Sequence, residues 1–547
     1  MSNLGRSSAL LGVGTMASRL TGLLRTVVLV GLIGSNASAV ADAFFVANQL
    51  PNSIFGIISV GILTAVVVPQ IVKATADSDG GNAFISKMFS LGTTVLVLAT
   101  GAAMVLAPWL VALQLRPDNP QQIALATAFA YWCLPQILFY GLYALLGETL
   151  NARRIFGPFT WAPVANNIIS IVGFLLMGAL FGQDLTNVAV WTPEMIAWLG
   201  GVSTLGIAVQ AAVLLLFWRA TGIALRIDFR WRGAGLGNLG RVAGWTLLMA
   251  LSSLAAGFYQ SWVANEASGQ GAAAAVMSNA WLVFMLPYSM IVYSIGTPYF
   301  TQIAEHASAR RTAEVRRDIS RSIRVLGFFI TGALAATTAA AIPASRVFTN
   351  TPADSIDAAI VLLCYLIGLL PLAILFIVQR TFYAYGDTRT PFLFTLLQGV
   401  IVVATTSMAA ALNAAGILPT ALLAAAVALG QSAASTLQTV VAIALLRRRM
   451  GHLGARTWLL SLVRCMVAAV PSTFAGVGLF VLLGGVDGWM VSDKLLGALG
   501  SLAIGGVVLL VYVGVLALIR VPEIHIATSV LRRKLFKSAS ERERPVS

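Results

Sequence analysis

The sequence has few charged residues for its length. Asp, Glu, Lys and Arg make up only 10% of its 547 residues, whereas 58% are hydrophobic and the mean hydropathy is +0.87. A surface of that composition would not stay dissolved in water, which excludes a soluble globular protein. The sequence therefore predicts an all-α polytopic membrane protein.

Residues that carry common enzyme chemistry are also scarce. The three cysteines, Cys133, Cys364 and Cys465, lie singly in apolar stretches, so we expect neither a disulfide framework nor a metal site. The sequence contains no phosphate-binding glycine loop, no nucleophile elbow and no Walker motif. We expect no enzyme, no cofactor and no self-contained ATP-driven pump.

Long hydrophobic stretches are abundant. About fourteen of them are long enough to cross a membrane as helices. They lie near residues 8–33, 41–72, 84–113, 122–149, 158–181, 195–218, 240–266, 272–304, 322–345, 355–380, 390–413, 417–446, 457–484 and 495–519.

Basic residues are distributed unevenly between the loops. If the N-terminus is cytoplasmic, only Arg116, Arg346 and Lys494 of the 35 Lys and Arg residues fall in outward loops. Cytoplasmic loops carry the excess of Lys and Arg in membrane proteins, so both termini are predicted to be cytoplasmic. The net charge of +15 is thereby explained by topology, without a nucleic-acid partner, and it also attracts anionic lipid headgroups.

A weak internal repeat relates the two halves of the chain. Leu-Pro-Asn-Ser at residues 50–53 returns as Leu-Pro-Tyr-Ser at 286–289, and Thr-Leu-Asn-Ala at 149–152 as Thr-Phe-Tyr-Ala at 381–384. Both offsets, about 232–236 residues, span six helices, so the halves should share one orientation in the membrane. The predicted divisions are a first lobe of helices 1–6 (1–220), a second lobe of helices 7–12 (221–450), two further helices (451–520) and a basic tail (521–547).

Two arginines, Arg19 and Arg25, lie inside the first hydrophobic stretch. At 1.5 Å per residue they are roughly 9 Å apart along a helix, and they project about 120° apart around it. A charge at the centre of a membrane helix costs at least about 2.5–3.5 kcal/mol, so it normally faces a polar cavity or a partner. The pair predicts a cationic cavity for an anionic cargo; a structural ion pair is the alternative.

Several runs of residues resemble one known family. They are Ser-Arg-Leu-Thr-Gly-Leu-Leu-Arg at 18–25, Ala-Asp-Ala-Phe-Phe-Val-Ala at 41–47, Leu-Pro-Asn at 50–52, Asn-Ala-Arg at 151–153, Phe-Gly-Pro at 156–158, Ala-Pro-Val-Ala-Asn-Asn at 162–167, and Phe-Tyr-Ala with Gly-Asp-Thr-Arg-Thr-Pro at 382–391. Together they resemble the MurJ/MviN family of lipid II flippases. Its wider superfamily includes multidrug/cation antiporters and polysaccharide flippases.

The resemblance implies a fold, a cargo and a location. It implies two six-helix lobes around a central cavity, and two C-terminal helices that form a lateral groove for the lipid tail. The cargo would be lipid II, the undecaprenyl-diphosphate-linked peptidoglycan precursor, flipped by alternating access across the bacterial cytoplasmic membrane. Arg19 and Arg25 would bind its diphosphate. Membrane lipids and a monovalent cation are the other candidate partners. Without a Walker motif, the energy for transport must come from an ion gradient, the membrane potential or the gradient of the cargo itself.

Further charged residues have two interpretations each. Asp42 is either a partner that closes the outer gate or competes with the cargo for an arginine, as the resemblance favours, or an ordinary interfacial carboxylate. Arg464 either extends to the membrane surface or lines a portal to the cavity. Asp387 and Thr388 form either an ion site or, as we favour, a loop cap. Glu148 is expected to pair with Arg153 or Arg154.

The chain departs from the common pattern of the family at several positions. Family members often have charged residues where this chain has Thr26, Phe55, Gly56, Val60, Trp281 and Leu282. The full set of cavity cations is therefore not present. The polar residues that we assign as candidates for the cavity or its portal are Asn48, Gln49, Asn52, Gln260 and Asn279.

Three other functions remain open. One is flipping of another polyprenyl-linked saccharide. A second is cation-coupled drug antiport, which requires buried carboxylates; the spans are short of these apart from Glu148 and Glu266, near their ends. The third is a membrane scaffold for cell-wall synthesis, which would tolerate loss of the two arginines.

Overall fold

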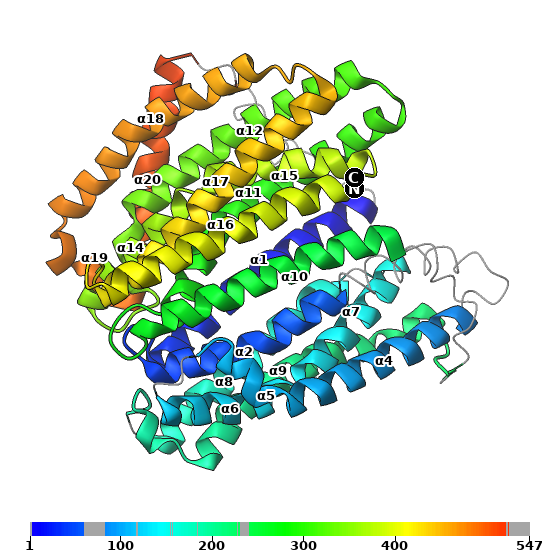
Figure 1. The fold of residues 1–547 in the computed structure, drawn as a ribbon, viewed down its shortest axis with the longest axis vertical. Coiled ribbons are helices and arrows are strands. Elements are labelled where there is room, and N and C mark those ends of the chain that lie inside the picture. Colours follow the sequence, from blue (N-terminus) through cyan, green and yellow to red (C-terminus); the bar gives the residue numbers. More distant parts are fainter. Residues whose placement is uncertain are drawn as a thin grey trace, which may run out of the picture. The chain divides into compact units, whose positions relative to one another are not determined.

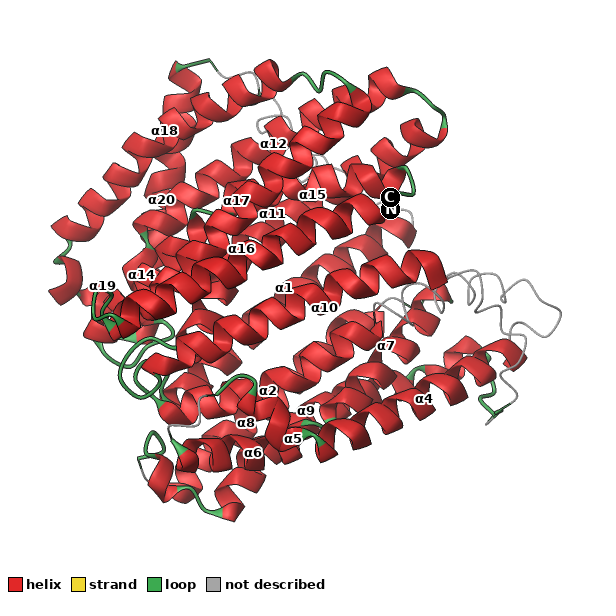
Figure 2. Cartoon of the chain, viewed as in Figure 1, coloured by secondary structure: helices red, strands yellow, loops and turns green. Residues whose placement is uncertain are grey.

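The structure, a computed structural model, describes residues 3–59, 82–115, 119–153, 155, 157–182, 184–226, 228–229, 240–520 and 523. Within these ranges the chain is helical (Figure 2), and the only β pairing is an isolated bridge between Ser35 and Ala37. The predicted all-α class is confirmed. Val60, Arg116, Arg154 and, except for Glu523, the predicted tail lie outside the described residues.

Figure 1 labels the principal helices. In chain order the α-helices are α1 (Asn3–Ile33), α2 (Ala39–Ile58), α4 (Asn82–Val105), α5 (Ala107–Ala112), α6 (Pro120–Cys133), α7 (Gln136–Ala152), α8 (Gly157–Phe181), α9 (Pro193–Leu216), α10 (Gly240–Ala264), α11 (Ala274–Ser308), α12 (Thr312–Ala339), α13 (Ala341–Arg346), α14 (Pro352–Leu366), α15 (Leu369–Ala384), α16 (Arg389–Ala414), α17 (Leu423–Met450), α18 (Ala455–Leu482), α19 (Trp489–Ser492) and α20 (Lys494–Leu518). Short 3-10 helices are η2 (Val188–Val190), η3 (Trp218–Thr221), η5 (Asn265–Ala267), η6 (Thr420–Leu422) and η7 (Gly485–Asp487).

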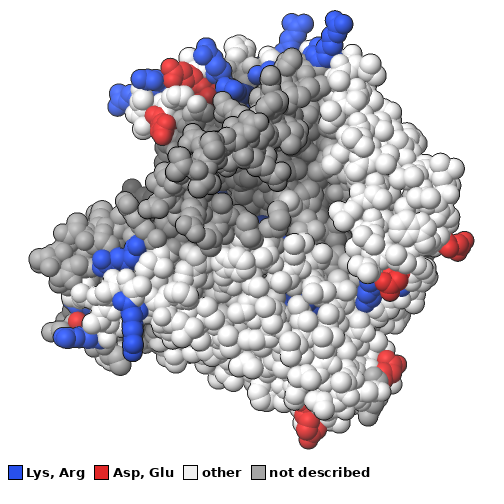
Figure 3. All heavy atoms as spheres, turned by 180° about the vertical axis from the view of Figure 1, so that it is seen from behind, with Lys and Arg blue, Asp and Glu red and all other residues white. Residues whose placement is uncertain are grey.

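The helices match the predicted membrane spans. Among the described residues, 12 helical segments are long and apolar enough to cross a membrane, and they coincide with the third to fourteenth predicted spans. The first two predicted spans begin with α1 and α2. Figure 3 shows one face of the molecule, on which wide uncharged areas separate the charged side chains. A polytopic helical membrane protein is therefore confirmed.

Polar side chains mark where helices begin. The Ser38 hydroxyl accepts a hydrogen bond from the Ala41 amide at 3.2 Å and so caps α2. At the start of α14, Thr351 and Asp354 form a reciprocal capping box. Such caps satisfy amides that have no partner within the helix, so α2 and α14 each begin at a defined residue.

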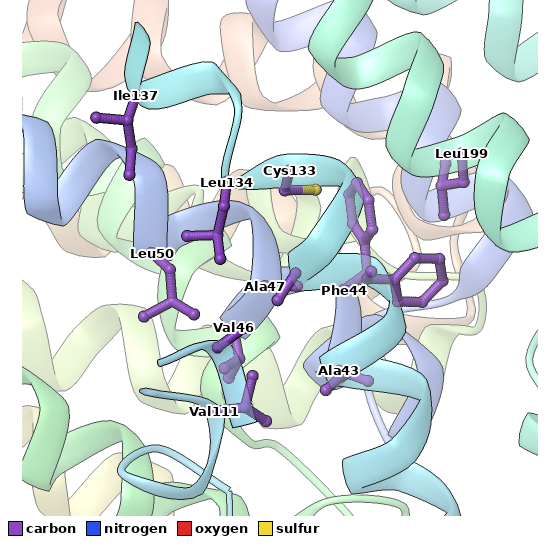
Figure 4. Close-up of a cluster of buried hydrophobic side chains, with 14 of the residues drawn as sticks. Ala43, Phe44, Val46, Ala47, Leu50, Val111, Cys133, Leu134, Ile137 and Leu199 are labelled. Carbon is purple, nitrogen blue, oxygen red and sulfur yellow. The ribbon is translucent and has the colours of Figure 1, made fainter. Parts of the chain in front are cut away.

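The first compact unit contains residues 1–277, 348–350 and 395–427. A hydrophobic core of this unit joins α2, α6, α7 and α9 (Figure 4), and in it Phe44 meets Phe129 edge to face at 5.3 Å. In this unit α1 packs along α8, and α8 packs along α9. Small residues allow the close approach: a methyl group at Gly206 of α9 would overlap the side chain of Asn166.

The second compact unit contains residues 278–347, 351–394 and 428–547. Helices α12, α18 and α20 pack together, and the Tyr512 hydroxyl of α20 donates to the Phe328 carbonyl of α12 at 2.9 Å. Cys465 of α18 is buried in this core. The unit boundaries differ from the predicted lobe boundaries at residues 220 and 450, and the lobes stay a prediction.

Candidate substrate-binding site

Helix α1 carries both predicted cavity arginines. It is continuous from Asn3 to Ile33 and contains no acidic residue. Arg19 and Arg25 lie in its middle, and both side chains are half-buried. No described residue forms an ion pair with Arg25. Its positive charge is therefore not neutralised by a carboxylate in the described part of the chain.

An aromatic pair lies next to Arg25. The Arg25 guanidinium interacts electrostatically with the Tyr140 hydroxyl of α7. The Tyr140 ring stacks on Phe55 of α2 with 5.8 Å between ring centroids. Phe55 is one of the positions at which the family resemblance led us to expect a charged residue. Here an aromatic ring fills that place and leaves Arg25 as the charged group of this cluster.

A buried amide extends the cluster along α7. Gln136 is fully buried one helical turn before Tyr140, so the two side chains share a face of α7. The Gln136 amide donates to Asn48 Oδ1 of α2 at 3.1 Å and to the Thr204 hydroxyl of α9 at 3.2 Å. The structure thus places Asn48 in a polar network with Gln136, a residue that the sequence did not single out.

Two asparagines of α8 hold α1 and α9 in place. The Asn167 amide donates to the Ser18 carbonyl and to the Thr21 hydroxyl of α1, both at 3.0 Å. The neighbouring Asn166 amide donates to Gln210 Oε1 of α9 at 3.1 Å. These bonds fix α1 next to the position of Arg19. The sequence contained a signal for them, because the Asn-Asn pair belongs to a motif that carried the family resemblance.

Asp42 is fully buried at the start of α2. Its carboxylate accepts hydrogen bonds from the Ser268 hydroxyl at 2.6 Å and from the Ala275 amide of α11 at 2.8 Å. The Gln122 amide of α6 in turn donates to the Ser268 hydroxyl at 2.8 Å. Asp42 thus connects the start of α2 to Ser268 and to the start of α11, and its role stays a prediction. In the described ranges Asp42 forms no ion pair with an arginine.

The remaining predicted site residues are not brought together with Arg25. Asn52 and Arg464 are exposed, and Gln49 is half-buried. The expected pairing of Glu148 with Arg153 or Arg154 stays a prediction, because Arg154 lies outside the described residues. The roles of these residues stay predictions.

Asp387 lies in the turn between α15 and α16. Its carboxylate accepts from the Thr390 amide at 3.0 Å and from the Thr390 hydroxyl at 2.8 Å, and it pairs with Arg449 at 2.7 Å. These contacts fit a loop cap, whereas the ion site with Thr388 stays a prediction. Within the described ranges no group of three or more His, Cys, Asp or Glu residues is arranged to hold a metal ion.

One intramembrane cation was missed by the sequence analysis. Arg380 lies in the candidate span Pro352–Ala384, one turn before the end of α15. The predicted span 355–380 ends at this residue, and the sequence analysis gives Arg380 no role. The apolar residues that continue after it were the signal that the helix extends further.

Comparison with known proteins identifies the family. A family model described as lipid II flippase MurJ matches residues 32–499. The chain belongs to the MurJ family of lipid II flippases. The matched range begins after Arg19 and Arg25, so the roles of these two arginines stay predictions.

Individual relatives agree with this assignment. A probable lipid II flippase MurJ of Rhizobium meliloti (strain 1021) is 27% identical over 420 residues, which cover 74% of this chain and 75% of the relative. Another, from Rhizobium tropici, is 25% identical over 488 residues, covering 86% and 85%.

Solved structures share the MurJ fold. A lipid II flippase MurJ in an inward closed conformation matches with a TM-score of 0.69 at 16% identity, over 96% of this chain and 100% of that chain. An inward-facing multidrug resistance MATE family transporter matches with a TM-score of 0.63 at 16% identity, over 80% and 95%. These likenesses show that the chain shares the helical fold of these two solved structures.

Proposed function

We propose that this chain moves lipid II from the inner to the outer leaflet of the bacterial cytoplasmic membrane by alternating access, without catalysing a reaction. Membership of the MurJ family supports the cargo. The observation that carries the proposal is Arg25, a half-buried cation in the middle of a membrane helix that contains no acidic residue. Because a charge there is costly without a partner, a diphosphate is the chemistry that fits it.

Arg19 and Arg25 act together in this proposal. The six-residue spacing points the two side chains in different directions around α1, so they contact different oxygens of one diphosphate or pass it between them. Arginine suits this task because its planar fork of donors matches two phosphate oxygens at once. Asn167 keeps α1 in the rotation that presents both side chains.

The second unit contains an apolar groove that is suited to a lipid tail. Two adjoining hollows of about 550 and 580 Å³ lie along α18, and they share Leu370, Pro371, Met466 and Val470. The groove runs between α18 and the helices α12, α14, α15 and α17. We propose that it receives part of the undecaprenyl chain. This assigns the tail to one face of α18 rather than to the contact between α18 and α20.

Asp42 is the proposed gating residue at the outer side. Its two hydrogen bonds join the start of α2 to Ser268 and to the first turn of α11. Breaking them would release these segments from one another. The proposed orientation, with both termini in the cytoplasm, follows from the excess of basic residues in the inward loops.

The test is the exposure of lipid II on the outer leaflet of cells depleted of their own flippase. Such cells would carry the parent chain, Arg25→Ala, or Arg456→Ala, which removes an exposed arginine at the start of α18. We expect the parent and Arg456→Ala to restore exposure and Arg25→Ala, present in equal amount, to fail. Restoration by Arg25→Ala would contradict the cationic mechanism. Failure of the parent itself would contradict the cargo.

A further inference from the structure

Arg380 is a cation held by aromatic rings rather than by carboxylates. Its guanidinium carbon lies 5.1 Å from the ring centre of Phe376, 5.3 Å from that of Phe300 and 5.9 Å from that of Tyr383. Phe376 and Tyr383 lie one turn on either side of Arg380 on α15, whereas Phe300 comes from α11. Two helices thus form a three-ring cradle around one guanidinium.

The cradle itself is fixed by its neighbours. The Gln379 amide donates to the Tyr383 hydroxyl at 2.9 Å. The Phe376 ring meets Tyr293 of α11 edge to face at 5.8 Å. A methyl group at Gly296 of α11 would lie 2.7 Å from the Phe376 ring, so α11 approaches the ring closely only because this residue is glycine. The guanidinium is therefore positioned before any ligand arrives.

The Arg380 donors have no acceptor in the described part of the chain. No hydrogen bond or ion pair links Arg380 to another described residue, and its side chain is only half-buried, so a ligand can reach it. Arg449 is the matched contrast in the same unit. It also lies over a ring, 5.3 Å from Tyr385, but its guanidinium donates to the Asp387 carboxylate at 2.7 Å.

Stacking and hydrogen bonding use different parts of a guanidinium. Aromatic rings cover its flat faces, whereas its five N–H groups point outward in its plane. A stacked arginine without a carboxylate therefore keeps a planar fork of donors ready for two oxygens of one anion. Phosphate is the anion whose geometry matches that fork. In a membrane span, phosphate groups belong to lipids.

We infer that Arg380, held by Phe300, Phe376 and Tyr383, binds the phosphate of a membrane lipid. The charge pattern assigns this end of α15 to the cytoplasmic side of the membrane. Arg380 lies about one helical turn before that end, at the depth of the phosphates of the inner leaflet. The phosphate belongs either to the diphosphate of the cargo, in which case the inference rests on the proposed function, or to a phospholipid headgroup.

The test measures lipid binding to the purified full chain in dodecyl maltoside, a detergent without phosphate. Lipid II and dioleoylphosphatidylglycerol are titrated separately into the parent, Arg380→Gln and Arg449→Gln. We expect Arg380→Gln to bind one of the two lipids at least about tenfold more weakly, because a bidentate charged hydrogen bond is lost. Arg449→Gln should stay within about twofold of the parent, because its donors already serve Asp387. The weakened lipid identifies the source of the phosphate.

Parent-level binding of both lipids by Arg380→Gln would overturn the inference. If Arg380→Gln does not accumulate, Arg380→Lys replaces it: the charge remains but the planar fork is lost, and the same lipid should again bind more weakly. A parent that binds phosphatidylglycerol but not lipid II would contradict the proposed cargo. The comparison of the parent with Arg380→Gln in phosphatidylglycerol binding would then decide whether Arg380 binds a lipid phosphate. A parent that binds neither lipid would overturn the site as well.

Discussion

Asn167 of α8 donates to the Thr21 hydroxyl of α1, a residue that lies between Arg19 and Arg25. The same amide also donates to the Ser18 carbonyl. Side chains point outward from a helix in fixed directions, about 100° apart from one residue to the next. A rotation of α1 about its axis would therefore redirect both guanidiniums by the same angle. An amide on a neighbouring helix thus holds α1 at two residues close to its arginines.

Replacing Asn167 with leucine should therefore affect transport and stability together. Hydrogen bonds between membrane helices contribute about 0.6–1.7 kcal/mol each, so Asn167→Leu should lower the midpoint of thermal unfolding and reduce lipid II exposure. Thr26→Val is the control, because Thr26 donates only to Gly22 of its own helix. If Asn167→Leu matched the parent in both measurements, α1 would be held by packing alone.

Replacing Asp42 with asparagine separates two possible roles of this residue. The amide has one acceptor oxygen in place of two, so it loses either Ser268 or the Ala275 amide as a donor. Hydrogen bonds to a charged group contribute about 1.5–3 kcal/mol, so unfolding should occur at lower temperature. Ser268→Ala should have a smaller effect in the same direction on both stability and lipid II exposure. Loss of exposure in Asp42→Asn alone, with Ser268→Ala equal to the parent, would favour competition for an arginine instead.

Filling the apolar groove of the second unit should block the lipid tail. Met466 lines both hollows, so Met466→Trp places an indole where we propose that the undecaprenyl chain lies. We expect weaker binding of lipid II and lower exposure in cells. Val481→Trp is the matched control, because Val481 is 64% exposed on the same helix and does not line either hollow. Equal binding by the two variants would place the tail elsewhere.

Asp387 offers a test of the predicted ion site. Because Thr390 and Arg449 already engage its carboxylate, Asp387→Asn should lower the thermal unfolding midpoint equally in sodium chloride and in choline chloride. Arg449→Gln should lower it in the same way. A sodium-dependent stabilisation of the parent that disappears in Asp387→Asn would instead assign a bound cation to this turn.

Much of the fold could be predicted because its main signal is local. Each span is a continuous apolar stretch of the length that a bilayer requires, and twelve of the predicted stretches appear as membrane-length helices in the described ranges. Individual motifs also identified α1 and its arginines. Both kinds of signal lie within a few tens of neighbouring residues.

The partners across helices could not be predicted in this way. Asp42 meets Ala275, which lies 233 residues later, and Gln136 meets Asn48 across 88 residues. Nothing in the local sequence around Gln136 indicates that its amide will join three helices. Arg380 shows the same limit, because the sequence singled out neither this residue nor the Phe300 ring beside it. The sequence thus located many of the charges, and the packing decided which neighbours they have.

The burial of the three cysteines determines how easily the movements of this chain can be followed with thiol-reactive probes. Cys133 and Cys465 are fully enclosed by surrounding side chains, and Cys364 is half-buried. Maleimide-type probes react with accessible thiolates, so the two enclosed cysteines should stay unlabelled in the folded protein. Replacing Cys364 alone would then give a nearly silent background for a single reporter thiol. The natural chain is therefore close to ready for spectroscopy of its conformational cycle in intact membranes.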